Sequence, residues 1–472
     1  MEKAREYCRL FGVFGCKDAV EKVYYGLYSL QHRGEESAGI ASSDSTGIIH
    51  HRGLGLVSDV FNPLILKNLE RPNAIGHVRY STYGTNDIDN AQPLVVTYSR
   101  GEVAVAHNGQ LLDACKLRDD YEQHGSIFHT TSDTEVIVHL MAKPSHAVRD
   151  NLSHVLNHLK GAFSLLFLTK DEMVGVRDPN GFRPLSLGKV NGSYVIASET
   201  CALNQIGAEY IRDVEPGEVV YVNKYGLRSE IYCSPRRIRP SYCIFELIYF
   251  SRPDSVIFGE SVHMFRKRLG MRLAEEFPVD ADIVISVPEG GNSAALGYSH
   301  FSGIPLERGF IRNHYVGRTF IQPEQARRDR KVELKLNAIS EVIKGKKVVV
   351  VDDSIVRGTT SKSRLSLLRK AGAKEIHVRI SCPPLRFPCH YGIDFQIKEE
   401  LIAAKHSIDE IRGFLQVDSL AYLGIQSTLS CASISGGHYC NACFSGDYPV
   451  SPGDSSNKNN KSESKRKKRV EA

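Results

Sequence analysis

The 472-residue chain has no apolar run long enough to cross a membrane, and its first residues lack the apolar core of a signal peptide. Both absences argue against a membrane-spanning or secreted protein, so we expect a cytoplasmic one. No repeat at the period of a solenoid protein is present either. In a reducing compartment the eleven cysteines are expected to be free, catalytic or metal-bound rather than paired in disulfides.

Net positive charge is small outside the C-terminal segment. The formal net charge is +6, and residues 455–472 hold seven Lys or Arg and only two Glu. The rest of the chain is therefore nearly neutral, which argues against a nucleic-acid-binding body. Residues 447–472, rich in Ser, Asn and Lys, are predicted to form a disordered basic tail. We expect neither a nucleic-acid nor a membrane partner.

The first half of the chain has few long helical patterns. Short β-type runs separated by turn signals, such as residues 102–109, 164–169, 193–198 and 218–222, predict antiparallel sheets. Residues 132–142 are the clearest helix. This combination indicates a layered α+β domain.

The second half has a different pattern, after a Pro- and Arg-rich candidate linker at residues 233–243. Residues 281–288 and 346–353 include continuous β-branched runs, typical of parallel strands buried on both faces. A helical pattern over residues 361–373 precedes another β-type run at 374–381. The order strand, helix, strand predicts a doubly wound α/β sheet.

A phosphate site is predicted at residues 348–361, "VVVVDDSIVRGTTS". A buried strand ends in Asp352 and Asp353, and a loop with Gly358 and several hydroxyls leads to a helix expected near Ser361. Ligands bind beyond the carboxyl ends of parallel strands, and a helix N-terminus suits a phosphate. The acids are suited to sugar hydroxyls or Mg²⁺. Simple helix capping is the alternative, but it does not require two adjacent acids.

Five residues of the first half together suit the amino acid glutamine. Cys8 is a candidate nucleophile near the start of the chain. Asn108 and Gly109 offer donors for an oxyanion, although Asn-Gly is also a common hairpin turn. Arg79 suits a carboxylate. Asp133 suits an ammonium, although a residue just before a helix is often an N-cap.

These patterns resemble two known families. Residues 348–361 resemble the phosphoribosyl pyrophosphate (PRPP) signature of type I phosphoribosyltransferases, and the first-half set resembles the class II glutamine amidotransferases. Over residues 8 to about 446, the chain resembles the glutamine PRPP amidotransferases, or amidophosphoribosyltransferases. Their motifs occur in family order as "SLQHRG", "IGHVRYST", "HNG", "RDPNGFRPL", "FSRPDS", "YVGRTFIQP" and "VDDSIVRGTTS".

The resemblance implies an α+β N-terminal-nucleophile glutaminase with αββα layers, followed by an α/β type I phosphoribosyltransferase domain with a parallel sheet. The implied divisions are a propeptide (1–7), a glutamine amidotransferase domain (8–236), a phosphoribosyltransferase domain (237–446) and the tail (447–472).

The resemblance also implies a reaction, the first committed step of purine synthesis. Removal of the propeptide would expose the α-amino group of Cys8 as general base for its own thiol. Asn108 and Gly109 would bind the oxyanion, and Arg79 and Asp133 the glutamine. Ammonia would pass through the interior to PRPP, displace pyrophosphate and form 5-phosphoribosylamine.

A PRPP site with Mg²⁺ is implied in the second half. Asp352 and Asp353 would contact the ribose and Mg²⁺, and a loop over residues 312–323 would close over the reacting carbon. The residues expected to bind PRPP are Tyr315, Arg318, Asp352, Asp353, Ser354, Arg357, Gly358, Thr359 and Thr360.

Four cysteines of the second half stand apart from the rest: Cys243, Cys389, Cys440 and Cys443. Four thiolates suit zinc or an iron–sulfur cluster, and spacing alone does not decide between them. Unconnected buried thiols are a further alternative for Cys243 and Cys389. The motifs "YCIFE", "FPCHYGI" and "CNACFSGDYP" resemble an iron–sulfur branch of the family, which implies a structural [4Fe–4S] cluster at these four residues.

Three positions depart from the family pattern. Arg9 follows the nucleophile where relatives usually have Gly, Glu35 stands where they usually have Gln, and Gly290 where they often have a hydroxyl. Either Arg9 adopts ordinary strand geometry or glutamine use is impaired, which leaves an ammonia-dependent phosphoribosyltransferase as the alternative function.

A PRPP-sensing nucleic-acid-binding regulator is a third hypothesis. The family also suggests a homo-oligomer, dimer or tetramer, inhibited by purine nucleotides.

Overall fold

The computed structural model describes residues 8–80, 87–143, 151–312, 336–434 and 438–452. None of the helices in these ranges combines the length and the apolar character that a membrane crossing requires. The predicted propeptide and the tail beyond residue 452 lie outside these ranges, and so do Tyr315 and Arg318.

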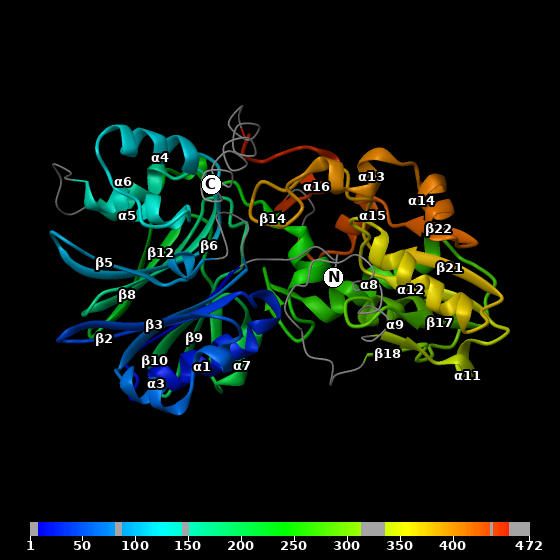
Figure 1. Cartoon of the computed structure of the whole chain (residues 1–472), viewed down its shortest axis with the longest axis horizontal. Coiled ribbons are helices and arrows are strands. Elements are labelled where there is room, and N and C mark those ends of the chain that lie inside the picture. Colours follow the sequence, from blue (N-terminus) through cyan, green and yellow to red (C-terminus); the bar gives the residue numbers. More distant parts are fainter. Residues whose placement is uncertain (1–7, 81–86, 144–150, 313–335, 435–437, 453–472) are drawn as a thin grey trace, which may run out of the picture.

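Two antiparallel sheets form the first half (Figure 1). In spatial order, the strands of the first sheet are β11 (Glu209–Asp213), β9 (Ser186–Val190), β10 (Ser193–Ala197), β1 (Arg9–Phe14), β4 (Asn73–Arg79), β2 (Ser37–Asp44) and β3 (Gly47–Leu54). Those of the second are β13 (Gly226–Ile231), β12 (Glu218–Asn223), β8 (Glu172–Arg177), β7 (Gly161–Leu168), β6 (Gly101–Leu111) and β5 (Leu94–Tyr98).

The two sheets pack face to face between two layers of helices (Figure 1). Alternate residues of each strand point inward, so Leu10 and Ile75 of the first sheet belong to one buried cluster with Leu166 of the second. The outer face of the first sheet is covered by α1 (Ala19–Ser29), α2 (Val57–Val60), α3 (Pro63–Asn68) and α7 (Thr200–Gln205). That of the second is covered by α4 (Ala114–Gln123), α5 (Thr134–Ala142) and α6 (Asn151–His158). The predicted αββα layering is confirmed.

A four-stranded parallel sheet is the centre of the second half. Its spatial order is β17 (Ile283–Ser286), β20 (Lys347–Asp352), β21 (Glu375–Ile380) and β22 (Ser419–Tyr422). The longer helices around it are α8 (Val262–Glu276), α9 (Asn292–Ser302), α12 (Thr359–Lys370) and α14 (Ile408–Leu415). The predicted α/β class is thereby confirmed.

Short elements complete the second half. The helices are α11 (Ser340–Ile343), α13 (Ile402–Lys405), α15 (Ile425–Ser430) and α16 (Ala442–Ser445). The two-stranded pairs are β14 (Tyr242–Cys243) with β23 (Tyr439–Cys440), β15 (Val256–Ile257) with β16 (Glu260–Ser261), and β18 (Phe310–Arg312) with β19 (Leu336–Ala338). A single π-helical turn, η4, spans Glu246–Phe250.

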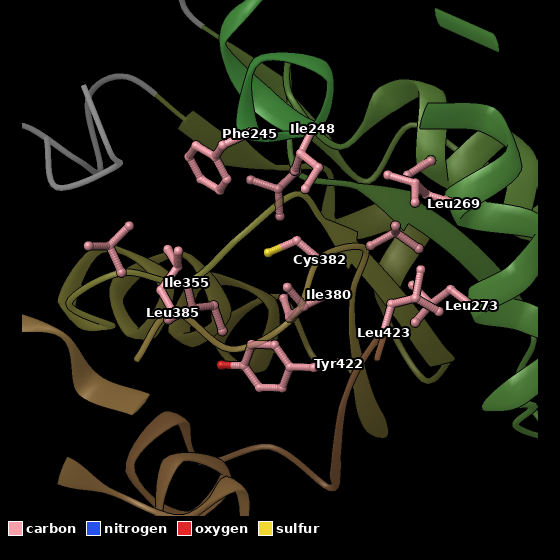
Figure 2. Close-up of a cluster of buried hydrophobic side chains, with 14 of the residues drawn as sticks. Phe245, Ile248, Leu269, Leu273, Ile355, Ile380, Cys382, Leu385, Tyr422 and Leu423 are labelled. Carbon is pink, nitrogen blue, oxygen red and sulfur yellow. The ribbon is translucent and has the colours of Figure 1, made fainter. Parts of the chain in front are cut away.

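Figure 2 shows part of the apolar core of this half. Phe245 and Ile248 belong to the same buried cluster as Leu269 of α8 and Ile380 of β21. Cys382 lies among these side chains and is fully buried. We therefore assign Cys382 to the core packing, as expected for a small apolar side chain.

The predicted linker is attached to the first half by backbone hydrogen bonds. The Ser241 N–H donates to Asn180 O (2.7 Å), and the Cys243 N–H donates to Phe182 O (3.2 Å). The segment that joins the two sheet systems is therefore held in place on the loop after β8. The proposed boundary between residues 236 and 237 stays a prediction.

Candidate active sites

Cys8 lies at the end of the first sheet, immediately before β1. It is 8% exposed and has φ 73°, a left-handed conformation that is uncommon for a residue with a side chain. Arg9 lies opposite Val78 in the ladder between β1 and β4, so Cys8 is adjacent to Arg79, the last residue of β4. Strand pairing therefore brings the predicted nucleophile and the predicted carboxylate binder together.

Asn108 and Gly109 lie within β6 and do not form the hairpin turn that Asn-Gly often makes. Gly109 pairs with Phe163 of β7, and a Cβ on Gly109 would lie only 2.0 Å from Ala162 O. Close strand approach and a φ of 146° therefore require glycine here. The backbone N–H and C=O of Phe163 both bond to Asp178, at 3.3 and 2.9 Å.

The Asn108 side chain is fully buried, and within the described part of the chain its amide nitrogen and oxygen have no hydrogen-bond partner. Leaving a buried amide unsatisfied costs about 1–3 kcal/mol. Such an arrangement is typical of a group whose partner is a ligand. Asn108 is thus suited to donate to an oxyanion.

Asp133 precedes α5, but its side chain does not cap the helix. One carboxylate oxygen accepts from the Leu111 N–H at 3.0 Å, and the other lies 3.5 Å from His107 Nδ1. Burial alone would raise the pKa of Asp133, but His107, the Leu111 amide and Arg79 together hold this pKa below its usual value. An ionised Asp133 is suited to the ammonium group of a free amino acid, and Arg79 nearby is suited to its carboxylate.

Two histidines that the sequence did not single out support this site. His77 of β4 donates from Nε2 to His107 O (3.1 Å), and the His107 N–H donates to Gln92 Oε1 (2.7 Å). Burial lowers the pKa of His77 to about 3, so the ring is neutral. His77 occurs in the motif "IGHVRYST" and His107 in the motif "HNG", but only strand packing shows that they touch.

The predicted phosphate loop follows β20. Asp352, Asp353 and Ser354 are buried at the carboxyl end of this strand. Gly358, with φ 80°, is the N-cap of α12, which begins at Thr359, two residues before the predicted start. The loop therefore combines acids, hydroxyls and a helix N-terminus at the edge where parallel sheets bind ligands.

Side chains of this loop already contact one another. Asp352 Oδ1 accepts from the Asp353 N–H (2.9 Å), and Asp353 Oδ1 accepts from Ser354 Oγ (2.6 Å). The guanidinium of Arg357 pairs with Glu400, which lies outside this loop in the sequence. Two adjacent carboxylates are the usual protein share of a Mg²⁺ site, where substrate phosphates and water supply the other ligands.

All four singled-out cysteines line one cavity, together with Phe182 and Arg183 of the first half and Tyr391, Ile393, Ala442 and Tyr448 of the second. Cys243 and Cys440 are paired by the β14–β23 ladder, and Cys443 follows in α16. Within the described residues, no three His, Cys, Asp or Glu side chains gather around a point that one metal ion could occupy. Four thiols spread around a cavity fit a polynuclear cluster better than a single zinc ion.

Comparison with known proteins matches both halves. The family model for a glutamine amidotransferase domain matches residues 77–205, and that for a phosphoribosyl transferase domain matches residues 275–386. The amidophosphoribosyltransferase of Bacillus subtilis (strain 168) is 48% identical over 451 residues, which cover 94% of each chain. That of Methanothermobacter thermautotrophicus is 44% identical over 456 residues, 95% of each chain.

Two solved structures agree with the whole described fold. One, described as the allosteric regulatory enzyme of purine biosynthesis, has a TM-score of 0.90 at 48% identity and covers 95% of this chain and 97% of its own. The other, the glutamine PRPP amidotransferase of B. subtilis complexed with ADP and GMP, has a TM-score of 0.89 at 47% identity. It covers 95% of this chain and 98% of its own.

Proposed function

Because the chain belongs to the amidophosphoribosyltransferase family, we propose that its two sites perform the two half-reactions of that enzyme: amide cleavage of glutamine and amination of PRPP. The products are glutamate, pyrophosphate and 5-phosphoribosylamine, in the first step of purine biosynthesis. The observation that carries this proposal is the gathering of Cys8, Arg79, Asn108 and Asp133 at one end of the paired sheets.

In the glutaminase half, Arg79 binds the α-carboxylate of glutamine and Asp133 its ammonium group. The Cys8 thiol attacks the amide carbon and forms a C–S bond, while Asn108 and Gly109 donate to the developing oxyanion. The thiol proton passes through the Cys8 α-amino group to the departing nitrogen, which leaves as ammonia. Water then cleaves the thioester to glutamate. This assignment includes removal of residues 1–7, since only a terminal Cys8 has a free amine.

In the transferase half, residues 354–361 hold the 5-phosphate at the N-terminus of α12. Asp352 and Asp353 accept hydrogen bonds from the ribose hydroxyls and supply two carboxylates for Mg²⁺, which neutralises charge on the pyrophosphate when bound. Tyr315 and Arg318, outside the described residues, are proposed to contact PRPP. Ammonia attacks C1, and the C1–O bond to pyrophosphate breaks.

Contacts between the halves support transfer of ammonia through the interior. Gln396 Nε2 donates to Gln110 Oε1 at 2.9 Å, and Arg183 Nη2 donates to Tyr391 O at 2.7 Å. The strand that carries Asn108 and Gly109 is therefore attached directly to the second half. Neutral ammonia released on this side is close to the interface and need not enter the bulk solvent.

Cys243, Cys389, Cys440 and Cys443 are proposed to hold a [4Fe–4S] cluster with a structural role. Support comes from the shared cavity and from the distance in sequence between the elements that supply the thiols.

Purine nucleotides are proposed as inhibitors, in line with the B. subtilis relative complexed with ADP and GMP. Assembly into a dimer or tetramer is proposed from family resemblance.

The test compares glutamine and ammonium chloride as nitrogen sources and measures pyrophosphate release from PRPP. We expect activity with both, loss of only the glutamine-dependent rate in Cys8→Ala, and loss of both rates in Asp353→Asn. Activity with ammonium chloride alone would favour the ammonia-dependent transferase. Binding of PRPP without pyrophosphate release from either source would favour a regulator. Intact mass shows whether the purified chain begins at Cys8.

A further inference from the structure

Five charged side chains are buried together where the two halves meet: Arg9, Arg33, Arg183, Glu199 and Glu246. We call this set the Arg–Glu cluster. Arg33 pairs with both glutamates, and Arg183 Nη1 lies 2.9 Å from Glu246 Oε1. Removing so many charges from water costs free energy unless each charge is paired and hydrogen-bonded. The pairs therefore hold these five side chains in fixed positions relative to one another.

Arg9 connects the cluster to the candidate nucleophile. Its Nη1 donates to the Cys8 carbonyl oxygen at 2.8 Å, and its Nη2 lies 3.2 Å from both carboxylate oxygens of Glu246. Its Nε is 3.6 Å from Glu199. Arg9 is itself the first residue of β1 and has ordinary strand geometry, so its side chain reaches back along the chain to the residue before it.

Glu246 brings the second half into this arrangement. It begins η4, and it accepts a further hydrogen bond from Ser251 Oγ at 3.1 Å. Arg183, which also binds Glu246, holds Tyr391 O of the segment that follows Cys389. The carbonyl of Cys8 is therefore linked through one guanidinium to a carboxylate that the transferase half holds in place.

The backbone of Cys8 needs such support. Once residues 1–7 are removed, as the proposed function requires, Cys8 is a chain terminus joined to β1 by one peptide bond, and terminal residues are poorly ordered unless contacts hold them. A hydrogen bond to the Cys8 carbonyl fixes the peptide plane after the nucleophile, and with it the position of the Cys8 Cα, which carries both the amino group and the thiol side chain.

We propose that Arg9 is a positioning residue for glutamine cleavage, which clamps the Cys8 carbonyl to Glu246 of the second half. The proposal rests on the proposed function, in which Cys8 is the nucleophile. At a position where the family resemblance leads us to expect Gly, this chain has a side chain that holds the backbone. The clamp acts on the chemical step and leaves binding of glutamine by Arg79 and Asp133 unchanged.

Replacing Arg9 leaves a cation beside each of the two buried carboxylates. Glu199 and Glu246 keep Arg33, and Glu246 also keeps Arg183, so neither carboxylate is left without a cation. Arg9→Gly removes the clamp, and Arg9→Lys keeps the charge but lacks the planar fork that reaches two acceptors. Arg212→Lys is the matched control, because Arg212 binds Glu218 in a bidentate pair on the edge strand β11.

The experiment measures kcat and KM for glutamine, and the ammonia-dependent rate, in the parent chain and these three variants. We expect a fall of about tenfold or more in the glutamine kcat of Arg9→Gly, with KM and the ammonia-dependent rate unchanged, since misplacing a reacting group by about 1 Å costs on the order of 10²-fold. Arg9→Lys should recover part of the loss, and Arg212→Lys should match the parent. Alkylation of Cys8 by iodoacetamide should slow in parallel.

Three results would overturn the proposal: a parental glutamine kcat in Arg9→Gly, equal losses with glutamine and ammonia, or a changed first residue in the intact mass. The last would mean that Arg9 acts on processing. Cys8→Ala separates this inference from the proposed function. If Cys8→Ala keeps its glutamine-dependent rate, the proposed function fails; if it loses that rate while Arg9→Gly keeps it, only the role of Arg9 fails.

Discussion

Cys243 lies directly opposite Cys440 in the parallel ladder that β14 forms with β23. Cys243 ends the segment that enters the second half, whereas Cys440 belongs to residues 438–452, close to the C-terminal end of the described chain. Both line the cavity that Cys389 and Cys443 complete. A cluster bound there would join three distant segments of the chain, and the link would lie next to Arg183 at the meeting point of the halves.

Replacement of Cys443 by serine is expected to abolish the proposed cluster. Serine preserves the size of the side chain but is a poor ligand for iron. Protein purified without oxygen should lose its iron, its acid-labile sulfide and its visible absorbance, and its thermal midpoint should fall because the C-terminal segment is no longer tied down. Cys115→Ser, on the outer helix α4, is the control. One equivalent of zinc in colourless parent protein would contradict the prediction.

Asp133→Asn is expected to raise KM for glutamine by about 10- to 100-fold, since hydrogen bonds to charged groups contribute about 1.5–3 kcal/mol. The amide oxygen of asparagine still accepts from the Leu111 N–H, so the loop should keep its structure while the negative charge is lost. Steady-state assays with glutamine and with ammonium chloride separate the effects, because the ammonia-dependent rate should not change.

The exposed Asp119→Asn on α4 provides a control with the same change of charge. A fall in kcat without a change in KM would contradict the assignment of Asp133 to substrate binding.

Local sequence patterns predicted much of this molecule. The acids and hydroxyls after a run of four valines are contiguous, so one stretch predicted both the strand and the phosphate loop. Short β-type runs separated by turn signals also predicted the antiparallel sheets of the first half, whereas the αββα order of its layers was implied by the family resemblance. The start of α12 was misplaced by two residues, because Gly358 rather than a later residue serves as its N-cap.

Contacts between distant strands could not be predicted in this way. Asn-Gly indicates a hairpin locally, but the pairing of β6 with β7 keeps Asn108 and Gly109 within a strand. His77 contacts His107, and Arg9 contacts Glu246. Each contact joins two distant segments of the chain, and no local sequence pattern predicts it. The sequence showed that Arg9 departs from the family pattern, and only the fold showed what its guanidinium touches.

Asn108→Ala is expected to lower the glutamine kcat by about 10²–10³-fold, the usual cost of losing an oxyanion donor. KM should change little, because the amide is proposed to act on the transition state rather than on bound substrate. The ammonia-dependent rate and the thermal midpoint serve as internal controls. A variant with parental kcat would contradict the assignment of Asn108 to the oxyanion.

Acid sensitivity of the fold is expected to depend on His77. Burial lowers the pKa of this ring to about 3, while an unfolded histidine has a pKa of about 6.5. The unfolded state therefore binds a proton that the folded state excludes once the pH falls below about 6.5. The stability contributed by neutral His77 is complete above that pH and decreases toward pH 3, by about 1.4 kcal/mol per pH unit.

His77→Gln should remove this contribution to the pH dependence, because an amide does not titrate yet can still donate toward His107 O. Urea unfolding followed by circular dichroism at pH 7 and at pH 5 measures the difference, and the parent should lose more stability than the variant across this interval. His124→Gln is the control, since the His124 side chain is 75% exposed and its removal should leave the parental slope. If the free energy of unfolding changed equally with pH in the parent and in His77→Gln, the folded protein would be able to bind a proton on His77 without separating the two sheets. The site would then not require a neutral ring.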